Sequence, residues 1–249
     1  MTPADPFMKV DFAFESFGAT DIGLRRKYNE DRFAMLPEHG VWLVADGMGG
    51  HAGGDYASQA VIDDLPSFEG ALTLGDLENR FHDGLAEAHV RMLRVAKALS
   101  MDAIATTVVG LLIYQDEFAS IWSGDSRLYQ MRDGSLKPVT RDHSEARELV
   151  DAGVLTPEQA RTWHRRNIVT RALGVYDHLS AETAYGEVAA GDTFLLCTDG
   201  LTEHVTDQEL EAILKEADSA QAAVEKMISK TLDRGAVDNV TAIVVRVQS

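Results

Sequence analysis

Apolar runs that stand next to an acidic residue recur along this chain and constrain its fold more than any other feature. Five runs rich in β-branched and large apolar residues predict strands over 41–45, 106–114, 118–122, 193–197 and 240–247. Aspartate is unfavourable inside a strand, so pairs such as Asp46-Gly47 and Asp199-Gly200 either make turns or project a carboxylate into a site. A single pair indicates a turn. Their recurrence predicts a sheet protein with carboxylates gathered at strand ends.

Helical spacing of apolar residues occurs between these runs. Three-to-four spacing predicts amphipathic helices over 54–65, 77–99 and 208–216. Two hairpins are indicated, one joining the runs on either side of residues 115–117 and one around Asp133-Gly134. The strands do not alternate with helices as they do in βαβ units. We therefore expect antiparallel sheets flanked by helices.

The segment 144–167 is predicted to be an excursion from the sheets. Residues 144–153 and 156–164 have helical character, with Thr156 as an N-cap and Pro157 at the first helical position. The chain contains no internal repeat and no low-complexity linker. Residues 1–249 are therefore predicted to form a single domain.

The composition limits the classes of partner. A formal net charge of -17 disfavours binding to nucleic acid or to an anionic membrane, although it is equally compatible with a merely solvated surface. The single cysteine, Cys197, cannot form an internal disulfide. The first residues show no signal-peptide pattern, and no apolar run reaches the length of a membrane span. We expect a cytoplasmic protein and a monomer, with no nucleic-acid or membrane partner.

The acidic residues favour a divalent metal site. Clustered carboxylates repel one another unless a cation lies between them, and Mg²⁺ and Mn²⁺ take oxygen ligands. The glycine-rich segment 46–54 allows close approach of the backbone to a ligand, but it has neither a Walker lysine nor a dinucleotide-binding register. Arg26 stands shortly before Asn29-Glu30-Asp31 and is suited to gripping phosphate, with an ordinary surface arginine as the alternative.

These residues are part of an ordered series of short motifs. The series is Thr20-Asp21-Ile22-Gly23, Arg26, Asn29-Glu30-Asp31, Val44-Ala45-Asp46-Gly47-Met48-Gly49-Gly50-His51, Thr106-Thr107, Ser123-Gly124-Asp125-Ser126-Arg127, Arg141-Asp142-His143-Ser144, Thr170-Arg171-Ala172-Leu173-Gly174, Cys197-Thr198-Asp199-Gly200-Leu201 and Asp238-Asn239-Val240-Thr241. Through them the chain closely resembles the metal-dependent protein phosphatases of type 2C, the PPM family, in their compact bacterial form.

The resemblance implies both a fold and a reaction. The fold is α+β, a four-layer αββα sandwich of two antiparallel β-sheets flanked by helices, with the metal site at one end of the sandwich. The implied enzyme is a serine/threonine protein phosphatase that hydrolyses phosphoserine and phosphothreonine with a metal-activated water. Its cofactors are two Mn²⁺ or Mg²⁺ ions and a third, weaker ion.

The resemblance also assigns roles to individual residues. Asp46 bridges the two ions and the Gly47 carbonyl binds one of them, while Asp199 and Asp238 complete the other. Further roles fall to Glu30 and Asp31 through metal-bound waters, to Asp125 at the third ion, and to Arg26 at the substrate phosphate. The implied catalytic set is Asp46, Asp199, Asp238 and Arg26.

One departure from eukaryotic relatives leaves the proton donor open. Met48 stands where those relatives carry a histidine proposed as general acid, and methionine cannot donate a proton. His51 or a metal-bound water could protonate the leaving alkoxide instead.

Two other functions and several pathways remain as alternatives. One is a catalytically silent member of the same fold, and the other is a structural module in which cations only hold loops together. The expected partners are phosphorylated proteins in a serine/threonine kinase pathway, with type VI secretion signalling among the candidates. The excursion at 144–167 is expected to tune the choice of substrate.

Overall fold

Two antiparallel sheets form the centre of the molecule in this computed structural model, which describes residues 12–49 and 53–248. The first sheet has the strand order β1-β11-β10-β7-β8, with bounds Ala13–Asp21, Val240–Gln248, Thr193–Cys197, Arg127–Arg132 and Ser135–Pro138. The second has the order β2-β3-β5-β6-β9, with bounds Asp31–Leu36, Val41–Met48, Val108–Tyr114, Glu117–Ser123 and Glu182–Glu187. A short strand, β4 (Ala105–Thr106), pairs with the end of β3.

The continuous apolar runs form the inner strands of both sheets. Strands β3, β5, β6, β10 and β11 are buried along almost their whole length. Each needs apolar residues on both faces, because one face meets the other sheet and the opposite face meets helices. One cluster of buried side chains, which includes Trp42, Phe194 and Ile243, fills the space between the sheets.

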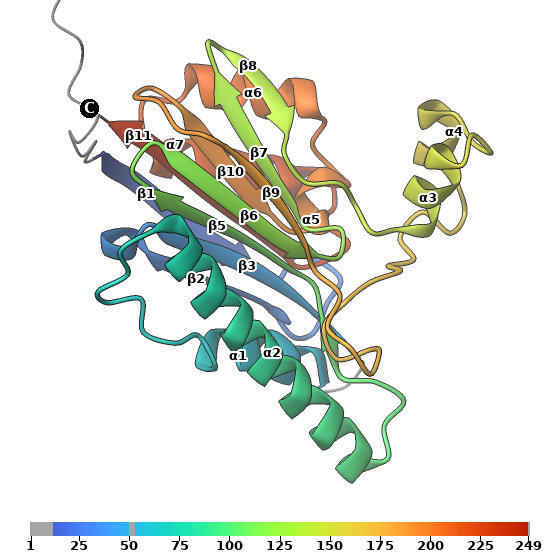
Figure 1. The fold of residues 1–249 in the computed structure, drawn as a ribbon. Helices are drawn as coiled ribbons and strands as arrows, with labels where there is room; N and C mark the ends of the chain where they lie inside the picture. Colours follow the sequence, from blue (N-terminus) through green and yellow to red (C-terminus); the bar gives the residue numbers. More distant parts are fainter. Residues whose placement is uncertain (1–11, 50–52, 249) are drawn as a thin grey trace, which may run out of the picture.

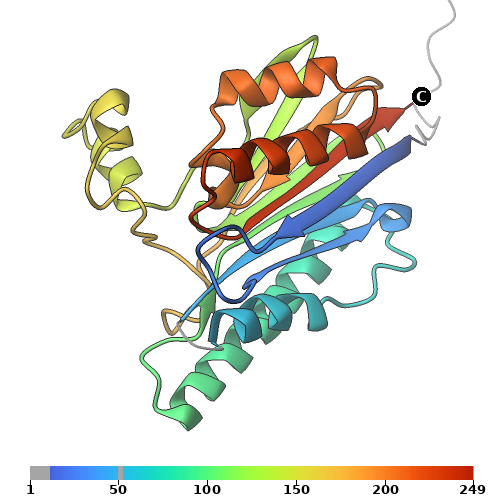
Figure 2. The ribbon, with the colours of Figure 1, turned by 180° about the vertical axis from the view of Figure 1, so that it is seen from behind.

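Helices cover the outer face of each sheet (Figures 1 and 2). Helices α1 (Gly53–Asp63) and α2 (Leu74–Leu99) pack on the second sheet around Phe81 and Leu85. Helices α6 (Asp207–Glu216) and α7 (Ala220–Asp233) pack on the first sheet around Leu210 and Met227. These layers confirm the predicted αββα sandwich.

The segment 144–167 contains two short helices that stand away from the sandwich in Figure 1. They are α3 (Glu145–Asp151) and α4 (Pro157–Arg161). The hydroxyl of Thr156 accepts a hydrogen bond from the Gln159 N–H in a capping box, and Pro157 occupies the first turn, as predicted. The remaining short helices are the 3-10 turn η1 (Pro37–His39) and α5 (Asp199–Thr202), which is separated from β10 by Thr198 alone.

The structure differs from the sequence prediction in several elements. Strands β1, β2 and β9 and helix α7 were not predicted, and the run 106–114 is divided at Thr107 into β4 and β5. Both predicted hairpins are present, and Asp133 and Gly134 have the positive φ values of a tight two-residue turn. Across residues 12–49 and 53–248, no helix combines the length and apolarity needed to cross a bilayer.

Candidate metal centre

The predicted acidic residues converge at one end of the sandwich, where strands of both sheets begin or end. Asp31 is the first residue of β2 and lies opposite Asp46 of β3 in the antiparallel register. Asp125 follows β6, and Asp199 follows β10 as the first residue of α5. Asp238 stands just before β11. Residues far apart in the sequence therefore share one end of the molecule.

Asp46 does not make the turn that an isolated Asp-Gly pair would suggest. It lies inside β3, which continues to Met48. Its carbonyl accepts hydrogen bonds from the Thr107 N–H and the Thr106 hydroxyl, both at 2.9 Å, and its N–H donates to the Thr107 hydroxyl at 3.2 Å. The paired threonines thus fix the backbone of a residue that is otherwise unfavourable in a strand.

Gly47 brings β3 close to the start of α1. A Cβ atom at Gly47 would lie 2.0 Å from the Gly54 carbonyl oxygen, so only glycine fits there. The Gly47 N–H donates to the Glu30 carbonyl at 3.1 Å, and the Ser58 hydroxyl donates to the same carbonyl at 2.5 Å. Glu30 and Gly47 are therefore neighbours beside Asp46, as the predicted site requires.

Asp31 is held by hydroxyl groups from the other sheet. Its Oδ2 accepts from Thr198 at 2.9 Å and from Thr241 at 2.7 Å, and the Thr241 hydroxyl lies 2.7 Å from that of Thr20. These contacts join the first residue of β2 to three strand ends of the opposite sheet. They orient the carboxylate without neutralising it.

The pKa values of several clustered carboxyl groups are raised, which indicates that nearby positive charge does not compensate for their burial and mutual repulsion. Burial raises the pKa of Asp46 well above its ordinary value, and the charges of Asp31 and Asp199 raise it further. Burial likewise raises the pKa of Asp199, with added repulsion from Asp125 and Glu203. Burial raises the pKa of Asp31 to about 6 and that of Asp125 to about 7.

Arg26 is the cation that contacts this group of carboxylates. Its guanidinium donates to Oδ2 of Asp238, and this hydrogen bond raises the pKa of Arg26. The charges of Glu30 and Asp46 act in the same direction, which places the guanidinium within electrostatic reach of both. The Arg26 side chain is about half exposed, so part of its set of donors faces solvent.

The donor set fits hard divalent cations. All the grouped side chains present oxygen atoms. Burial, and after it the neighbouring carboxylates, raises the pKa of Asp31, Asp46 and Asp199, and bound cations would favour their ionised forms. Within residues 12–49 and 53–248, no three His, Cys, Asp or Glu side chains are already arranged to hold an ion. The Asp238 carboxylate is paired with Arg26, and the Asp31 carboxylate is held by the Thr198 and Thr241 hydroxyls.

Several residues of the site were not given a role from the sequence. Thr198 and Thr241 hold Asp31, while Asn239 uses its amide to accept from the Glu30 N–H and to donate to the carbonyls of Ile22 and Tyr28. All three stand in the quoted motifs: Thr198 and Asn239 are directly beside a predicted ligand, and Thr241 is three residues after Asp238. Glu203, one turn after Asp199, adds negative charge near Asp199 and Asp125.

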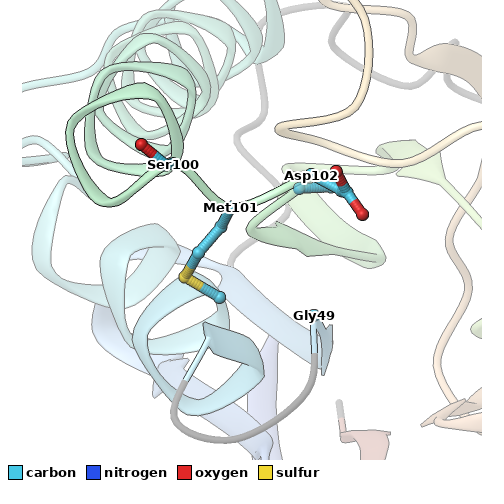
Figure 3. Close-up of a pocket in the computed structure, with 5 residues that line it drawn as sticks. Gly49, Ser100, Met101 and Asp102 are labelled. Atoms are coloured by element: carbon cyan, nitrogen blue, oxygen red, sulfur yellow. The ribbon is translucent and has the colours of Figure 1, made fainter.

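A pocket of about 390 Å³ lies near the end of β3, between Gly49 and the segment that follows α2 (Figure 3). Figure 3 shows Met101 pointing from that segment toward α1, and Met101 Cε would be 3.2 Å from a Cβ atom on Gly53. No carboxylate of the cluster lines this pocket. The candidate proton donor His51 lies outside the described residues.

Comparison with known proteins assigns this arrangement to a family. The model of protein phosphatase 2C matches residues 25–240. The serine/threonine phosphatase stp of Listeria welshimeri is 32% identical over 234 residues, which cover 91% of this chain and 93% of that protein.

Solved structures agree in fold over nearly the whole chain. PppA, described as a key regulatory component of the type VI secretion system in Pseudomonas aeruginosa, has a TM-score of 0.88 at 38% identity, covering 96% of this chain and 99% of that one. The catalytic domain of the phosphatase PstP in complex with two manganese ions has a TM-score of 0.82 at 31% identity, covering 96% and 100%. The chain therefore belongs to the protein phosphatase 2C family of metal-dependent serine/threonine phosphatases.

Proposed function

We propose that this phosphatase hydrolyses phosphoserine and phosphothreonine in proteins with two Mn²⁺ or Mg²⁺ ions held by Asp46, the Gly47 carbonyl, Asp199 and Asp238. The observation that carries the proposal is the group of carboxylates at one end of the sandwich, whose pKa values are raised by burial and further by one another's charge. Glu30 and Asp31 would orient waters around the ions, and Asp125 would serve a third, weaker ion.

Divalent cations, when bound, lower the pKa of a coordinated water and neutralise charge on phosphoryl oxygens. Other residues of the protein orient the carboxylates of the site. Thr106 and Thr107 fix the Asp46 backbone, and the Thr198 and Thr241 hydroxyls fix Asp31. Arg26 would bind the substrate phosphate through the guanidinium donors that Asp238 leaves free, which is the geometry that favours arginine at phosphate sites.

Activity measurements with and without metal test this proposal. The purified protein should hydrolyse an aryl phosphate and a phosphothreonine peptide in the presence of Mn²⁺ or Mg²⁺, and excess chelator should stop both reactions. Full activity in chelator would contradict the metal assignment. Binding of Mn²⁺ without any turnover would instead favour the silent or structural alternatives.

We infer a signalling pathway from the relatives alone. The 38% identity to PppA supports a role opposite a serine/threonine kinase in type VI secretion signalling, in the cytoplasm. Cells in which this phosphatase is replaced by its Asp199→Asn variant should then accumulate phosphothreonine on proteins of that secretion system. Accumulation confined to other proteins would place the enzyme in a different kinase pathway.

A further inference from the structure

The loop between β1 and β2 exposes large apolar side chains beside the candidate metal centre. Leu24 is 61% exposed and Tyr28 is 71% exposed, and they flank Arg26, which contacts Asp238. Val237, the residue before Asp238, is 49% exposed, and Ile22 is 38% exposed. Exposed apolar side chains that stand singly need no explanation, but four of them in the two segments next to Arg26, the proposed phosphate ligand, form a candidate contact surface.

Backbone contacts hold these residues on one surface. The Leu24 N–H donates to the Ala236 carbonyl at 2.9 Å, which joins the loop to the turn that leads into β11. Figure 2 shows the two segments side by side, in blue and red. The buried Asn239 amide donates to the carbonyls of Ile22 and Tyr28, at 2.9 and 3.0 Å.

The loop between β1 and β2 also packs closely against the backbone of Asp238. Gly23 has a φ of +73°, and a Cβ atom there would lie 2.2 Å from the Asp238 carbonyl oxygen. The Gly23 N–H donates to the Asp21 carboxylate at 2.8 Å. The backbone is therefore fixed while its large side chains face solvent. Such preorganisation lowers the entropy that binding would otherwise cost.

The same loop carries a local positive charge on an acidic protein. Arg25, Arg26 and Lys27 are consecutive and all exposed, although the chain has a net charge of -17. A peptide with acidic side chains is repelled by most of this surface but is attracted to the loop. The positive charge and the exposed apolar side chains thus both favour a peptide ligand, one that carries acidic and apolar side chains.

We infer that residues 22–28 and 236–238, the recognition rim, bind the polypeptide that flanks the phosphorylated serine or threonine and select apolar and acidic side chains there. The inference rests on the proposed function, because Arg26 at the substrate phosphate sets the position of that polypeptide. Leu24, Tyr28 and Val237 supply the apolar contacts, and Arg25 and Lys27 supply the charge.

The test compares two substrates on one enzyme. An aryl phosphate has no flanking polypeptide, whereas a phosphothreonine peptide with leucine and aspartate beside the phosphothreonine engages the rim. In the double variant Leu24→Ser/Tyr28→Ser, the ratio of kcat/KM for the peptide to kcat/KM for the aryl phosphate should fall roughly tenfold, the scale of losing a few apolar contacts. With glycine and serine flanks in place of leucine and aspartate, the ratio should change much less.

A matched control is available at the opposite end of the sandwich. Leu72 is 73% exposed and lies near His39 and Gly40, where β3 begins. Leu72→Ser removes a leucine that is even more exposed than Leu24 and should leave both activities unchanged. An unchanged ratio in Leu24→Ser/Tyr28→Ser, or an equal fall in Leu72→Ser, would overturn the inference. Absence of turnover by the wild-type protein on both substrates would overturn the proposed function and the inference with it.

The contribution of Arg25 and Lys27 to peptide binding can be measured separately. Arg25→Gln/Lys27→Gln should raise KM for the peptide with aspartate flanks several-fold at low salt, and added salt should shrink the difference, because exposed charges are screened. The same variant should not raise KM for a peptide whose flanks are leucine only. A KM that rises equally for both peptides would contradict the assigned role of the charge.

Discussion

The two ends of β10 each carry an aspartate, and the two differ in how their charge is balanced. Asp192, just before the strand, is buried, and burial alone would raise its pKa. Hydrogen bonds from Arg132, the Ala189 N–H and Gln130 outweigh burial and lower its pKa. Asp199, just after the strand, has carboxylates around it, and its pKa is raised.

The difference separates a structural carboxylate from a functional one. Asp192 is paired with a guanidinium that makes two hydrogen bonds to it, so it needs nothing from outside the chain. Asp199 lies among Asp125, Glu203 and Asp238, and of these Asp238 is paired with Arg26. The remaining repulsion among these carboxylates is relieved by bound cations or by protons. One strand is therefore preceded by a structural aspartate and followed by a proposed metal ligand.

The largest effect is expected from neutralising each of the two aspartates in turn. Asp199→Asn should reduce turnover by more than the roughly 100-fold that loss of an outer-shell partner can cost, because a ligand itself is removed. Its melting temperature in chelator should not fall, since the change relieves repulsion with Asp125 and Asp238. Asp192→Asn, the matched control on the same strand, should keep its turnover. Equal activity in the two variants would show that Asp199 is no more important for turnover than Asp192.

Bound metal should stabilise the protein through the carboxylates of the site and not through Asp192. At a free Mn²⁺ concentration about 100 times Kd, binding to the folded state adds about 2.7 kcal/mol to the free energy of unfolding. Asp46→Asn should lose most of this increase, whereas Asp192→Asn should retain it. Urea unfolding with Mn²⁺ and with chelator measures both. An undiminished increase in Asp46→Asn would remove Asp46 from the ligand set.

Removing the structural aspartate should cost stability in a pH-dependent way. Asp192→Ala should lower the free energy of unfolding by about 2 kcal/mol, the scale of hydrogen bonds to a charged group. Solvent screening of Arg132, which is 39% exposed, limits the loss.

The sign of the pH dependence follows from the lowered pKa of Asp192. The folded state keeps this carboxyl ionised more readily than the unfolded chain does. Its stabilisation should therefore be complete above the ordinary aspartate pKa of about 3.9 and should disappear as pH falls below it. Urea unfolding of wild type and Asp192→Ala from neutral to acid pH measures this. A difference that grows as pH falls would refute the assignment.

The smallest effect concerns the hydroxyls that orient Asp31. Thr241→Val removes a 2.7 Å hydrogen bond to that carboxylate and should weaken Mn²⁺ binding about tenfold, as loss of an outer-shell partner does. Thr231→Val is a suitable control, because this buried hydroxyl only donates to the Met227 carbonyl within α7. Equal Mn²⁺ affinities of the two variants in calorimetric titration would show that Thr241 is not a positioning residue.

Much of the fold was predictable because the inner strands are buried on both faces and carry continuous apolar runs. The edge strands β1, β2 and β9 were not. β1 contains Glu15, Ser16 and Gly18 and is only half-buried, so it forms through its pairing with β11 more than two hundred residues later. Helix α7 did leave a signal, since Ala220, Ala223, Val224 and Met227 follow helical spacing.

The candidate site was predictable as residue types but not as contacts. Each acidic motif could be identified, yet the carboxylate positions depend on partners that sequence spacing cannot supply. Thr198 and Thr241 reach Asp31 across separations of 167 and 210 residues. The place of Asp46 inside β3 was also missed, because only tertiary contacts from Thr106 and Thr107 stabilise an aspartate there.

The most direct test of the central claim is the number of Mn²⁺ ions bound per chain, measured by elemental analysis after equilibrium dialysis. We expect two tightly held ions in the wild-type protein and in Asp192→Asn, and a third only at higher Mn²⁺ concentration. Asp46→Asn should lose tight binding, because that carboxylate is proposed to bridge both ions. No tightly bound Mn²⁺ in the wild type, or two ions retained in Asp46→Asn, would contradict the proposed metal site.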